Sequence, residues 1–148
     1  MATWAERGEG RWGQLHSRAT VPSTLCPFCN SPSFVASNAL AYALPDRYPV
    51  NPGHTLIVPF RHVASFFDTT LEERAAMQQL VDEIKILLDR RYRPDGYNLG
   101  VNVGDAAGQT VAHVHIHVIP RYAGDTAMPR GGVRAVIPER QSYPSAPG

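Results

Sequence analysis

The sequence predicts an α+β fold, in which a five-stranded antiparallel sheet carries one long helix and a shorter helix near residues 61–67. Short stretches with alternating apolar residues are typical of strands, and one longer stretch has the apolar stripe of a helix. Turn residues separate these stretches. With 148 residues, the chain is long enough for one domain with a hydrophobic core of ordinary size.

Five stretches are expected to form the sheet. The first two form a hairpin with Ser37 and Asn38 near its turn, and residues 45–53 then form a loop rich in proline and other turn residues. The third stretch begins at His54 and is apolar enough to lie at the centre of the sheet. In chain order, the five stretches are residues 34–38, 40–44, 54–59, 97–103 and 110–121.

The long helix is expected to span residues 71–92. Thr70 and Glu73 have the spacing of a capping box, in which each side chain binds the other residue's main-chain N–H. A Pro-Asp-Gly turn at residues 94–96 ends the helix. Apolar residues recur every three or four positions and predict one buried stripe, formed by Met77, Leu80, Val81, Ile84, Leu87 and Leu88.

Composition and charge exclude several classes of protein. Hydrophobic residues make up 43% of the chain, charged residues make up 18%, and the net charge is only +1. These values are typical of a soluble globular protein, and they favour no specific nucleic-acid partner. The first residues lack the apolar segment of a signal peptide, and no stretch approaches the roughly 18 apolar residues of a membrane span. We therefore expect a cytoplasmic protein without a membrane partner.

The chain is expected to have three parts, which are an N-terminal arm of residues 1–25, a domain of residues 26–122 and a tail of residues 123–148. The arm has no sustained periodicity, so it is either disordered or docked on the domain or on a partner subunit. Trp4 and Trp12 are the candidate docking anchors. In the tail, residues 133–137 are expected to form a short strand or a docked segment.

Three histidines at alternate positions form the most informative feature of the sequence. His113, His115 and His117 alternate with apolar residues, so a strand would place all three imidazoles on one face. Such a row has two functional interpretations. One histidine could be a nucleophile that the others support, or the row could bind a metal ion.

The residues around this row resemble a known family. The sequence GQTVAHVHIHVIPR, residues 108–121, resembles the signature of the histidine triad superfamily of nucleotide hydrolases and transferases. It is most similar to the fragile-histidine-triad-like branch, which cleaves dinucleoside polyphosphates. The similarity extends to Asp46, to residues 51–59 and to residues 102–104, and it covers most of residues 26–121. The resemblance implies a HIT-like fold, a nucleotide substrate and a homodimer.

The resemblance also implies roles for the histidines. His115 would attack the α-phosphate and form a covalent nucleotidyl-histidine intermediate, which water then hydrolyses. Imidazole suits this role because its ordinary pKa of about 6.5 leaves it unprotonated near pH 7. His117 and the main chain would hold the tautomer of His115, while His113 would orient its neighbours or bind a metal ion. His54 and Gln109 would stabilise charge on the reacting phosphate.

The nucleotide-binding residues follow from the same resemblance. Asp46 would accept hydrogen bonds from the ribose hydroxyls, and the alternative for this residue alone is a turn-forming aspartate. The small-residue loop of residues 104–108 leads into the histidine row and would let main-chain N–H groups approach a phosphate. The expected nucleotide-binding set is Asp46, Asn102, Gly108, Gln109, Thr110, His115 and His117.

Cys26 and Cys29 form a Cys-x-x-Cys pair that could present two thiolates to a zinc ion. In zinc-containing histidine triad proteins, two histidines complete such a site, and His62 and His113 occupy the matching positions here. The resemblance therefore implies a structural Cys₂His₂ zinc site. The alternative is a pair of reduced, packed thiols. Magnesium is expected only as part of the substrate, because no group of carboxylates resembles a magnesium site.

Three classes of function remain open. The first is hydrolysis, with an adenylylated compound such as a dinucleoside polyphosphate as the leading substrate and a nucleoside phosphoramidate as the next candidate. The second is nucleotide transfer or phosphorolysis, against which His117 argues, because the uridylyltransferase and phosphorylase branches carry a glutamine at that position. The third is a nucleotide-binding sensor with slow turnover.

Overall fold

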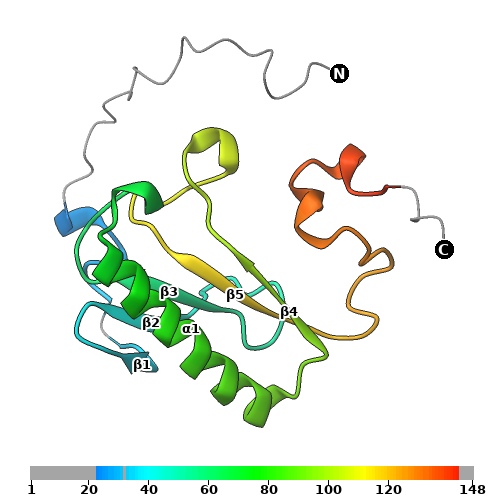
Figure 1. The fold of residues 1–148 in the computed structure, drawn as a ribbon, viewed down its shortest axis with the longest axis horizontal. Helices are drawn as coiled ribbons and strands as arrows, with labels where there is room; N and C mark the ends of the chain where they lie inside the picture. The colour runs from blue at the N-terminus through cyan, green and yellow to red at the C-terminus, as the bar shows by residue number, and fades with distance from the viewer. Residues whose placement is uncertain (1–22, 32, 144–148) are drawn as a thin grey trace.

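The five expected strands form a single antiparallel sheet in the order β1-β2-β3-β5-β4 (Figure 1). The structure is a computed structural model that describes residues 23–31 and 33–143. It confirms the α+β fold, with strands somewhat shorter than expected. The strands are β1 (Ala36–Ser37), β2 (Ala41–Pro45), β3 (Thr55–Pro59), β4 (Gly96–Gly100) and β5 (Ile116–Arg121).

The central strand β3 explains how the two faces of the sheet differ. It pairs with β2 and β5, and each of its five residues is buried. Leu56 lies opposite His117 in the register of β3 and β5, while Ile57 lies opposite Ile116. Because side chains alternate along a strand, Leu56 and His117 share one face and Ile57 and Ile116 share the other.

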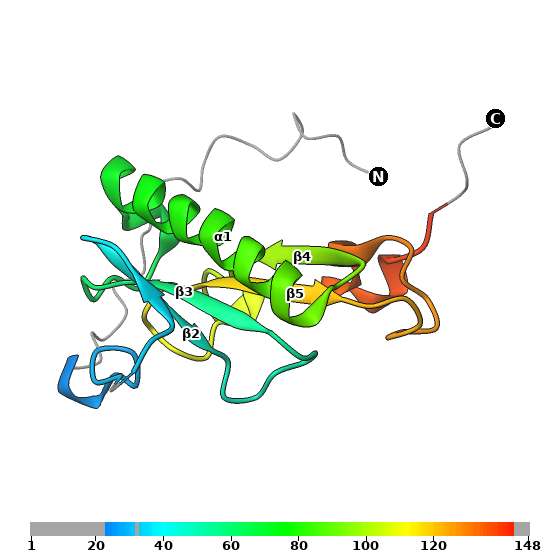
Figure 2. The same ribbon diagram turned by 90° about the horizontal axis from the view of Figure 1, so that it is seen from below.

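Helix α1 (Leu71–Tyr92) covers the Ile57 face of the sheet (Figure 2) and has the bounds that the sequence predicts. The capping box is present, since Thr70 and Glu73 bind each other's main-chain N–H groups. Met77 and Leu80 are fully buried between helix and sheet. Burial of a side chain of this size contributes about 2 kcal/mol of hydrophobic stabilisation.

The opposite face of the sheet carries the histidines and the N-terminal turn. Tyr42, Leu56 and Val58 form a second apolar cluster there, and Phe28 packs against it. The hydroxyl of Tyr42 donates a hydrogen bond to the carbonyl oxygen of Phe28, at 2.5 Å. The turn that contains both cysteines is therefore fixed to the face that α1 leaves open.

The prediction of a short helix near residues 61–67 was wrong. That part of the chain contains only a 3-10 turn, η3 (Phe66–Asp68), which Ser65 caps. Two contacts hold the preceding residues, which form no regular element. The guanidinium of Arg61 binds both carboxylate oxygens of Glu73, and the carbonyl oxygen of Val63 accepts a hydrogen bond from the N–H of Val114.

The strand expected over residues 110–121 begins later than predicted. Only His117 of the three histidines lies within β5, while His113 and His115 lie in the segment before it. The β3–β5 pairing ends at the Ile57–Ile116 pair. Beyond that pair, the carbonyl oxygen of Pro59 accepts a hydrogen bond from the ring of His113, which takes the place of a main-chain partner.

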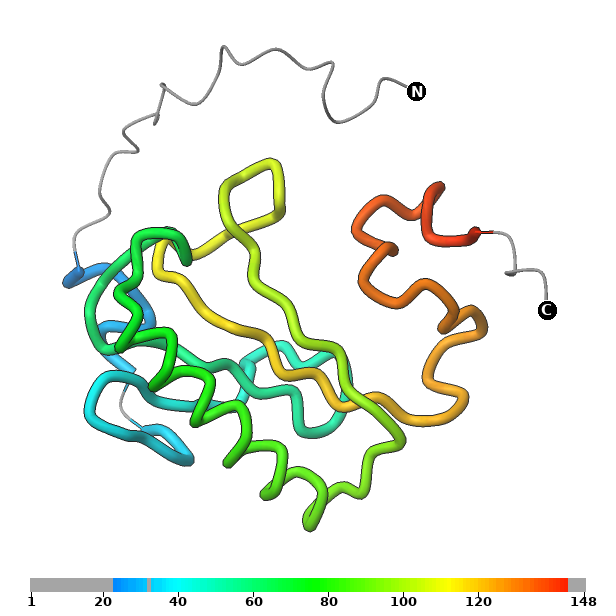
Figure 3. Tube along the Cα trace, in the orientation of Figure 1, coloured from blue at the N-terminus to red at the C-terminus, as the bar shows by residue number. Residues whose placement is uncertain are grey.

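Beyond β5, the chain forms two short 3-10 turns, η5 (Gly132–Val136) and η6 (Pro138–Arg140), and η5 contacts β4 (Figure 3). Residues 133–137 form no strand, and η5 contacts β4 although Val133, Val136 and Ile137 remain exposed. The predicted docking of Trp4 and Trp12 lies outside the described residues. The three-part division of the chain remains a prediction.

Gly53 provides a test of how the loop before β3 packs on α1. Its φ angle is +87°, and an added Cβ would lie 3.0 Å from side-chain atoms of both Leu88 and Tyr92. We expect Gly53→Ala to lower the free energy of unfolding by about 1–3 kcal/mol in urea denaturation, because it combines backbone strain with a clash. The matched control is Gly100→Ala, because Gly100 has no atom within 4 Å of the added Cβ. Equal stability of the two variants would contradict the described packing.

Candidate functional site

Four imidazole rings and one phenyl ring form a row on the face opposite α1. The ring of His115 lies 4.9 Å from that of His117, and the ring of His54 lies 5.2 Å from that of His117 (centroid to centroid). Phe28 contacts the other end of the row, with centroids 5.0 Å from His115 and 5.9 Å from His113. The structure thus brings the three expected histidines together with His54.

A main-chain carbonyl sets the tautomer of His115. Its Nδ1 lies 2.9 Å from the carbonyl oxygen of His113, and a carbonyl oxygen can only accept a hydrogen bond. Nδ1 therefore carries the proton, and Nε2 keeps its lone pair. The residue is only 8% exposed, so the ring is held in place while one side remains accessible.

A second chain of contacts sets the tautomer of His117. The N–H of Val50 donates to Nδ1 of His54 at 3.3 Å, so the proton of a neutral His54 is on Nε2. That Nε2 lies 3.0 Å from Nδ1 of His117 and 3.4 Å from a carboxylate oxygen of Asp46. His117 then accepts at Nδ1 and carries its own proton on Nε2.

Burial favours the neutral form of His54, His113 and His117. It lowers the pKa of His54 and of His113 from the ordinary value of 6.5. For His117, burial and the neighbouring His115 and His54 lower the pKa to about 4. Near pH 7, these rings therefore act as neutral donors, acceptors or metal ligands.

The two cysteines meet two histidines at one end of the row. The ligand atoms of Cys26, Cys29, His62 and His113 all lie within 4.8 Å of one another. Sulfur-to-Nδ1 distances are 3.5 Å for Cys26–His113, 3.2 Å for Cys29–His62 and 3.6 Å for Cys29–His113. Tetrahedral zinc, with its usual bond lengths, separates sulfur and nitrogen ligands by about 3.6 Å.

The tautomer of His113 also suits a metal ligand. Its Nε2 donates to the carbonyl oxygen of Pro59 at 2.8 Å, which leaves the lone pair of Nδ1 directed at the two cysteines. Such a hydrogen bond from the second nitrogen is the usual support of a metal-bound histidine. The four residues could therefore hold a metal ion.

The loop before the histidine row differs from the expected phosphate cradle. Gly104 and Gly108 have φ angles of +90° and +81°, which close a tight turn around η4 (Asp105–Ala107). The N–H groups of Ala107, Gly108 and Gln109 bind carbonyl oxygens within this same loop. These three donors stabilise the turn in the described structure.

Gln109 also has partners within the protein. Its side-chain oxygen accepts from the N–H of Gly104, and its amide nitrogen donates to the carbonyl oxygens of Ala64 and Val111. The amide therefore ties the loop to the segment after β3. The expected contact of Gln109 with the substrate remains a prediction.

Asn102 and His117 line a cavity of about 540 Å³ between the end of β4 and η5. Its apolar wall includes Val133 and Val136. Thr110 is exposed beyond the loop. The cavity thus connects the histidine row with the C-terminal segment.

Two features of the site were not foreseen from the sequence. Phe28 packs against both His113 and His115, and its position between the two cysteines is the only sequence signal for this role. Asp46 forms the turn that was its alternative role and also contacts His54, which was not expected, while its contact with the ribose stays a prediction. One carboxylate oxygen accepts from the N–H of Tyr48 in a turn, and the other lies beside His54.

Comparison with known proteins identifies related sequences. The HIT domain matches residues 30–124. An AP-4-A phosphorylase of Mycobacterium tuberculosis is 40% identical over 92 residues, which cover 62% of this chain and 47% of that protein. An uncharacterized HIT-like protein of Mycoplasma pneumoniae is 41% identical over 111 residues, or 71% of this chain and 77% of that one. A bis(5'-adenosyl)-triphosphatase of Dictyostelium discoideum is 40% identical over 82 residues, or 55% of each chain.

Solved structures with the same fold are also found. A HIT family protein from Bacillus anthracis superposes with a TM-score of 0.64 at 34% identity, over 68% of this chain and 76% of that one. A Zn-bound histidine triad family protein from Mycobacterium smegmatis superposes with a TM-score of 0.65 at 33% identity, over 72% of this chain and 81% of that one. The present chain spans about half the length of the M. tuberculosis relative. Within the described residues, no helix combines the length and apolar character needed to cross a bilayer.

The lowered pKa of His117 can be tested by titration. We expect its ring to stay neutral until the pH approaches about 4 in NMR spectra of the imidazole nitrogens. Between pH 6.5 and 4, the unfolded chain binds more protons at this residue than the folded chain. Its contribution to folding is therefore complete above pH 6.5 and decreases as the pH falls.

The variant His117→Gln is the control, since it removes this contribution. The loss of stability between pH 7 and pH 5, measured by urea unfolding, should be smaller in the variant. A midpoint near 6.5 for His117 in the folded protein would contradict its described surroundings.

Proposed function

Because this chain belongs to the histidine triad (HIT) family, we propose that it cleaves adenylylated nucleotides, such as dinucleoside polyphosphates, at the α-phosphate. The observation that carries the proposal is the hydrogen bond from Nδ1 of His115 to the carbonyl oxygen of His113. This bond leaves the lone pair of Nε2 free on a ring that is held in position. Relatives named as a phosphorylase and a triphosphatase of diadenosine compounds support this substrate class.

We assign the nucleophilic attack to Nε2 of His115. A bond forms between this nitrogen and the α-phosphorus, while the bond from phosphorus to the bridging oxygen breaks and the leaving group departs with both electrons. Water then attacks the phosphorus and loses a proton to solvent. The bond from phosphorus to Nε2 breaks, and the imidazole of His115 returns to its original form. The attack uses the lone pair of Nε2, which the hydrogen bond of Nδ1 to the carbonyl oxygen of His113 leaves without a partner among the described residues.

His117 and His54 support the reacting phosphate in this proposal. The contacts of Val50, His54 and Asp46 leave the Nε2–H of His117 as a hydrogen-bond donor next to His115. A donor held in a buried site stabilises negative charge that develops on phosphate oxygens. Because its pKa is about 4, His117 donates a hydrogen bond as a neutral ring.

The nucleotide would lie along the same face. We propose that the carboxylate of Asp46 accepts hydrogen bonds from the ribose hydroxyls, and that Thr110 contacts the phosphate beside Gly108. Asn102 and the cavity of about 540 Å³ would receive the part of the substrate beyond the α-phosphate. Gln109 would act by holding the loop, since its amide already binds Gly104 and Ala64.

Phosphorolysis is the second candidate reaction. In that case inorganic phosphate replaces water in the second step, and the product is a nucleoside diphosphate. The name of the M. tuberculosis relative favours this candidate, while the histidine at position 117 favours hydrolysis by the family pattern. Nucleoside phosphoramidates and slow turnover by a nucleotide sensor are further outcomes of the same assays.

We propose that Cys26, Cys29, His62 and His113 hold a structural zinc ion. Sulfur-to-nitrogen distances of 3.2–3.6 Å and the free Nδ1 of His113 support this assignment. A zinc ion with four protein ligands serves structure and has no open position for a substrate. When bound, it would link the N-terminal turn to the segment that carries His115.

A homodimer is also part of the proposal. Strand β4 lies at an edge of the sheet, and Leu99 on it is 48% exposed. Val133 and Val136 of η5 are also exposed beside this edge. An unpaired edge with neighbouring apolar side chains is suited to association with a second copy.

The variant His115→Gly tests the nucleophile. We expect hydrolysis of diadenosine triphosphate to fall on the order of 10⁴-fold or more, because the covalent route is lost. AMP should still bind with an affinity within about threefold in calorimetry, since the other contacts remain. Gln78→Ala, on the exposed side of α1, is the control and should keep full activity. Substantial turnover by His115→Gly would refute the assignment.

Zinc content tests the metal site. Protein purified without chelators should contain about one zinc ion per chain by elemental analysis. The double variant Cys26→Ser/Cys29→Ser should lose the ion and unfold at a lower urea concentration. Ser33→Ala, next to the same turn, is the control and should retain the metal. Absence of zinc from the parent protein would rule out the site.

A further inference from the structure

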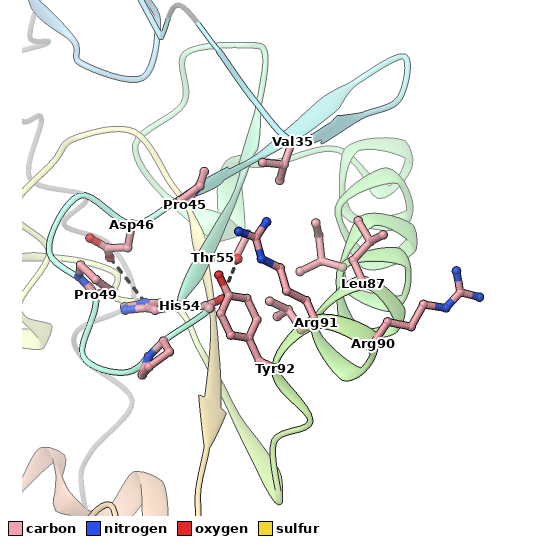
Figure 4. Close-up of a pocket in the computed structure, with 14 residues that line it drawn as sticks. Val35, Pro45, Asp46, Pro49, His54, Thr55, Leu87, Arg90, Arg91 and Tyr92 are labelled. Atoms are coloured by element: carbon pink, nitrogen blue, oxygen red, sulfur yellow. Dashed lines mark hydrogen bonds and ion pairs between the residues drawn. The ribbon is translucent and has the colours of Figure 1, made fainter.

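A second cavity lies on the α1 side of the sheet and reaches the histidine row only at His54. Its volume is about 630 Å³, which is within the range of small-molecule sites. The last turns of α1 form one wall, and the loop between β2 and β3 forms the other (Figure 4). Asp46 and His54, at its loop end, also belong to the proposed nucleotide site, whereas the residues of α1 that line the cavity have no role in the proposed reaction.

Most of the cavity wall is apolar. Leu87 is 46% exposed there, although aliphatic side chains on a helix face are usually covered by a neighbour. The ring of Tyr92 adds a flat surface, and the prolines offer no N–H groups to a ligand. The apolar wall consists of Val35, Pro45, Pro49, Pro52, Ile84, Leu87, Leu88 and Tyr92.

Charge is distributed unevenly along the cavity. The side chain of Arg91 extends across it towards Val35 and Pro45, whereas that of Arg90 points outwards (Figure 4). Among residues 23–31 and 33–143, no acidic side chain forms an ion pair with Arg91. At the other end, Asp46 is turned towards His54, 3.4 Å away. One end of the cavity therefore attracts an anion.

We propose that this cavity is a second ligand site, which takes a small amphipathic anion with an aromatic or branched aliphatic body and one carboxylate, sulfonate or phosphate group. The apolar wall would bury the body, and the guanidinium of Arg91 would bind the anionic group. The wall offers few hydrogen-bond partners, which disfavours a ligand that is recognised through many polar contacts.

Charge argues against the chain's own N-terminal residues as the occupant. Residues 1–22 carry three arginines against two glutamates, so they bring positive charge to a cavity whose free charge is already positive. A second copy of the chain is the other occupant to consider, and sedimentation of the Leu87→Glu variant distinguishes a dimer from a small-molecule ligand.

The wall of this cavity also supports the histidine row. Gly53 packs so closely on Leu88 and Tyr92 that no Cβ fits without a shift. The next residue is His54, whose Nε2 lies 3.0 Å from His117. A ligand that moves the last turn of α1 therefore also acts on the loop that holds His54.

The test uses the chain of 148 residues and NMR of its backbone amides. The probe is naphthalene-2-sulfonate, and naphthalene-2-sulfonamide is a control of the same shape without charge. We expect saturable shifts in residues 45–54 and 84–92, with the sulfonate bound at least tenfold more tightly than the sulfonamide. Shifts confined to the histidine face, or equal affinity for both probes, would overturn the proposal.

Variants separate this site from nonspecific binding. Arg91→Gln should weaken sulfonate binding at least fivefold, and Leu87→Glu should abolish sulfonate binding. The control Lys85→Gln removes one charge from the same helix and should change the affinity for the sulfonate less than twofold. Equal weakening by Arg91→Gln and Lys85→Gln would overturn the proposal. A dimer that is seen by sedimentation and that Leu87→Glu dissociates would also overturn the proposal, because a second copy of the chain would then cover this face. The measurements need no turnover and remain informative whether or not His115 is the nucleophile.

Discussion

Two main-chain carbonyls determine what the histidine row can do. The carbonyl oxygen of Pro59 accepts a hydrogen bond from His113, and that of His113 accepts one from His115. Carbonyl oxygens cannot donate, so each bond fixes which ring nitrogen carries the proton. His113 therefore directs a lone pair from Nδ1 towards the cysteines, while His115 keeps a lone pair on Nε2. Neighbouring histidines thus acquire different chemistry from the same type of contact.

This arrangement links the metal cluster to the proposed nucleophile. His113 contributes one ligand atom to the cluster through Nδ1 and also provides the carbonyl that holds His115. An ion that fixes His113 would therefore also fix the position of His115. At the other end of the row, Asp46 and His54 hold His117 as a neutral donor. The row is thus anchored at both ends by residues from β3 and its flanking loops.

The sequence predicted best those elements whose signals are local. The capping box of Thr70 and Glu73 placed the start of α1, and the Pro-Asp-Gly turn at residues 94–96 placed its end. The five stretches predicted all five strands, whereas Leu87 of the expected buried stripe is 46% exposed. Long-range contacts decided the rest. β5 begins only at Ile116 because the Pro59 carbonyl binds a side chain, and Gln109 turns inwards because Ala64 lies beside it. Neither partner can be identified from spacing along the chain.

The most direct test of the account is to trap the covalent intermediate during a single turnover of diadenosine triphosphate. Rapid quenching followed by mass spectrometry identifies the labelled residue, and phosphorus NMR distinguishes the two ring nitrogens. The described tautomer predicts an adenylyl group on Nε2 of His115. An adduct on Nδ1, an adduct on another side chain, or turnover without any adduct would contradict the account.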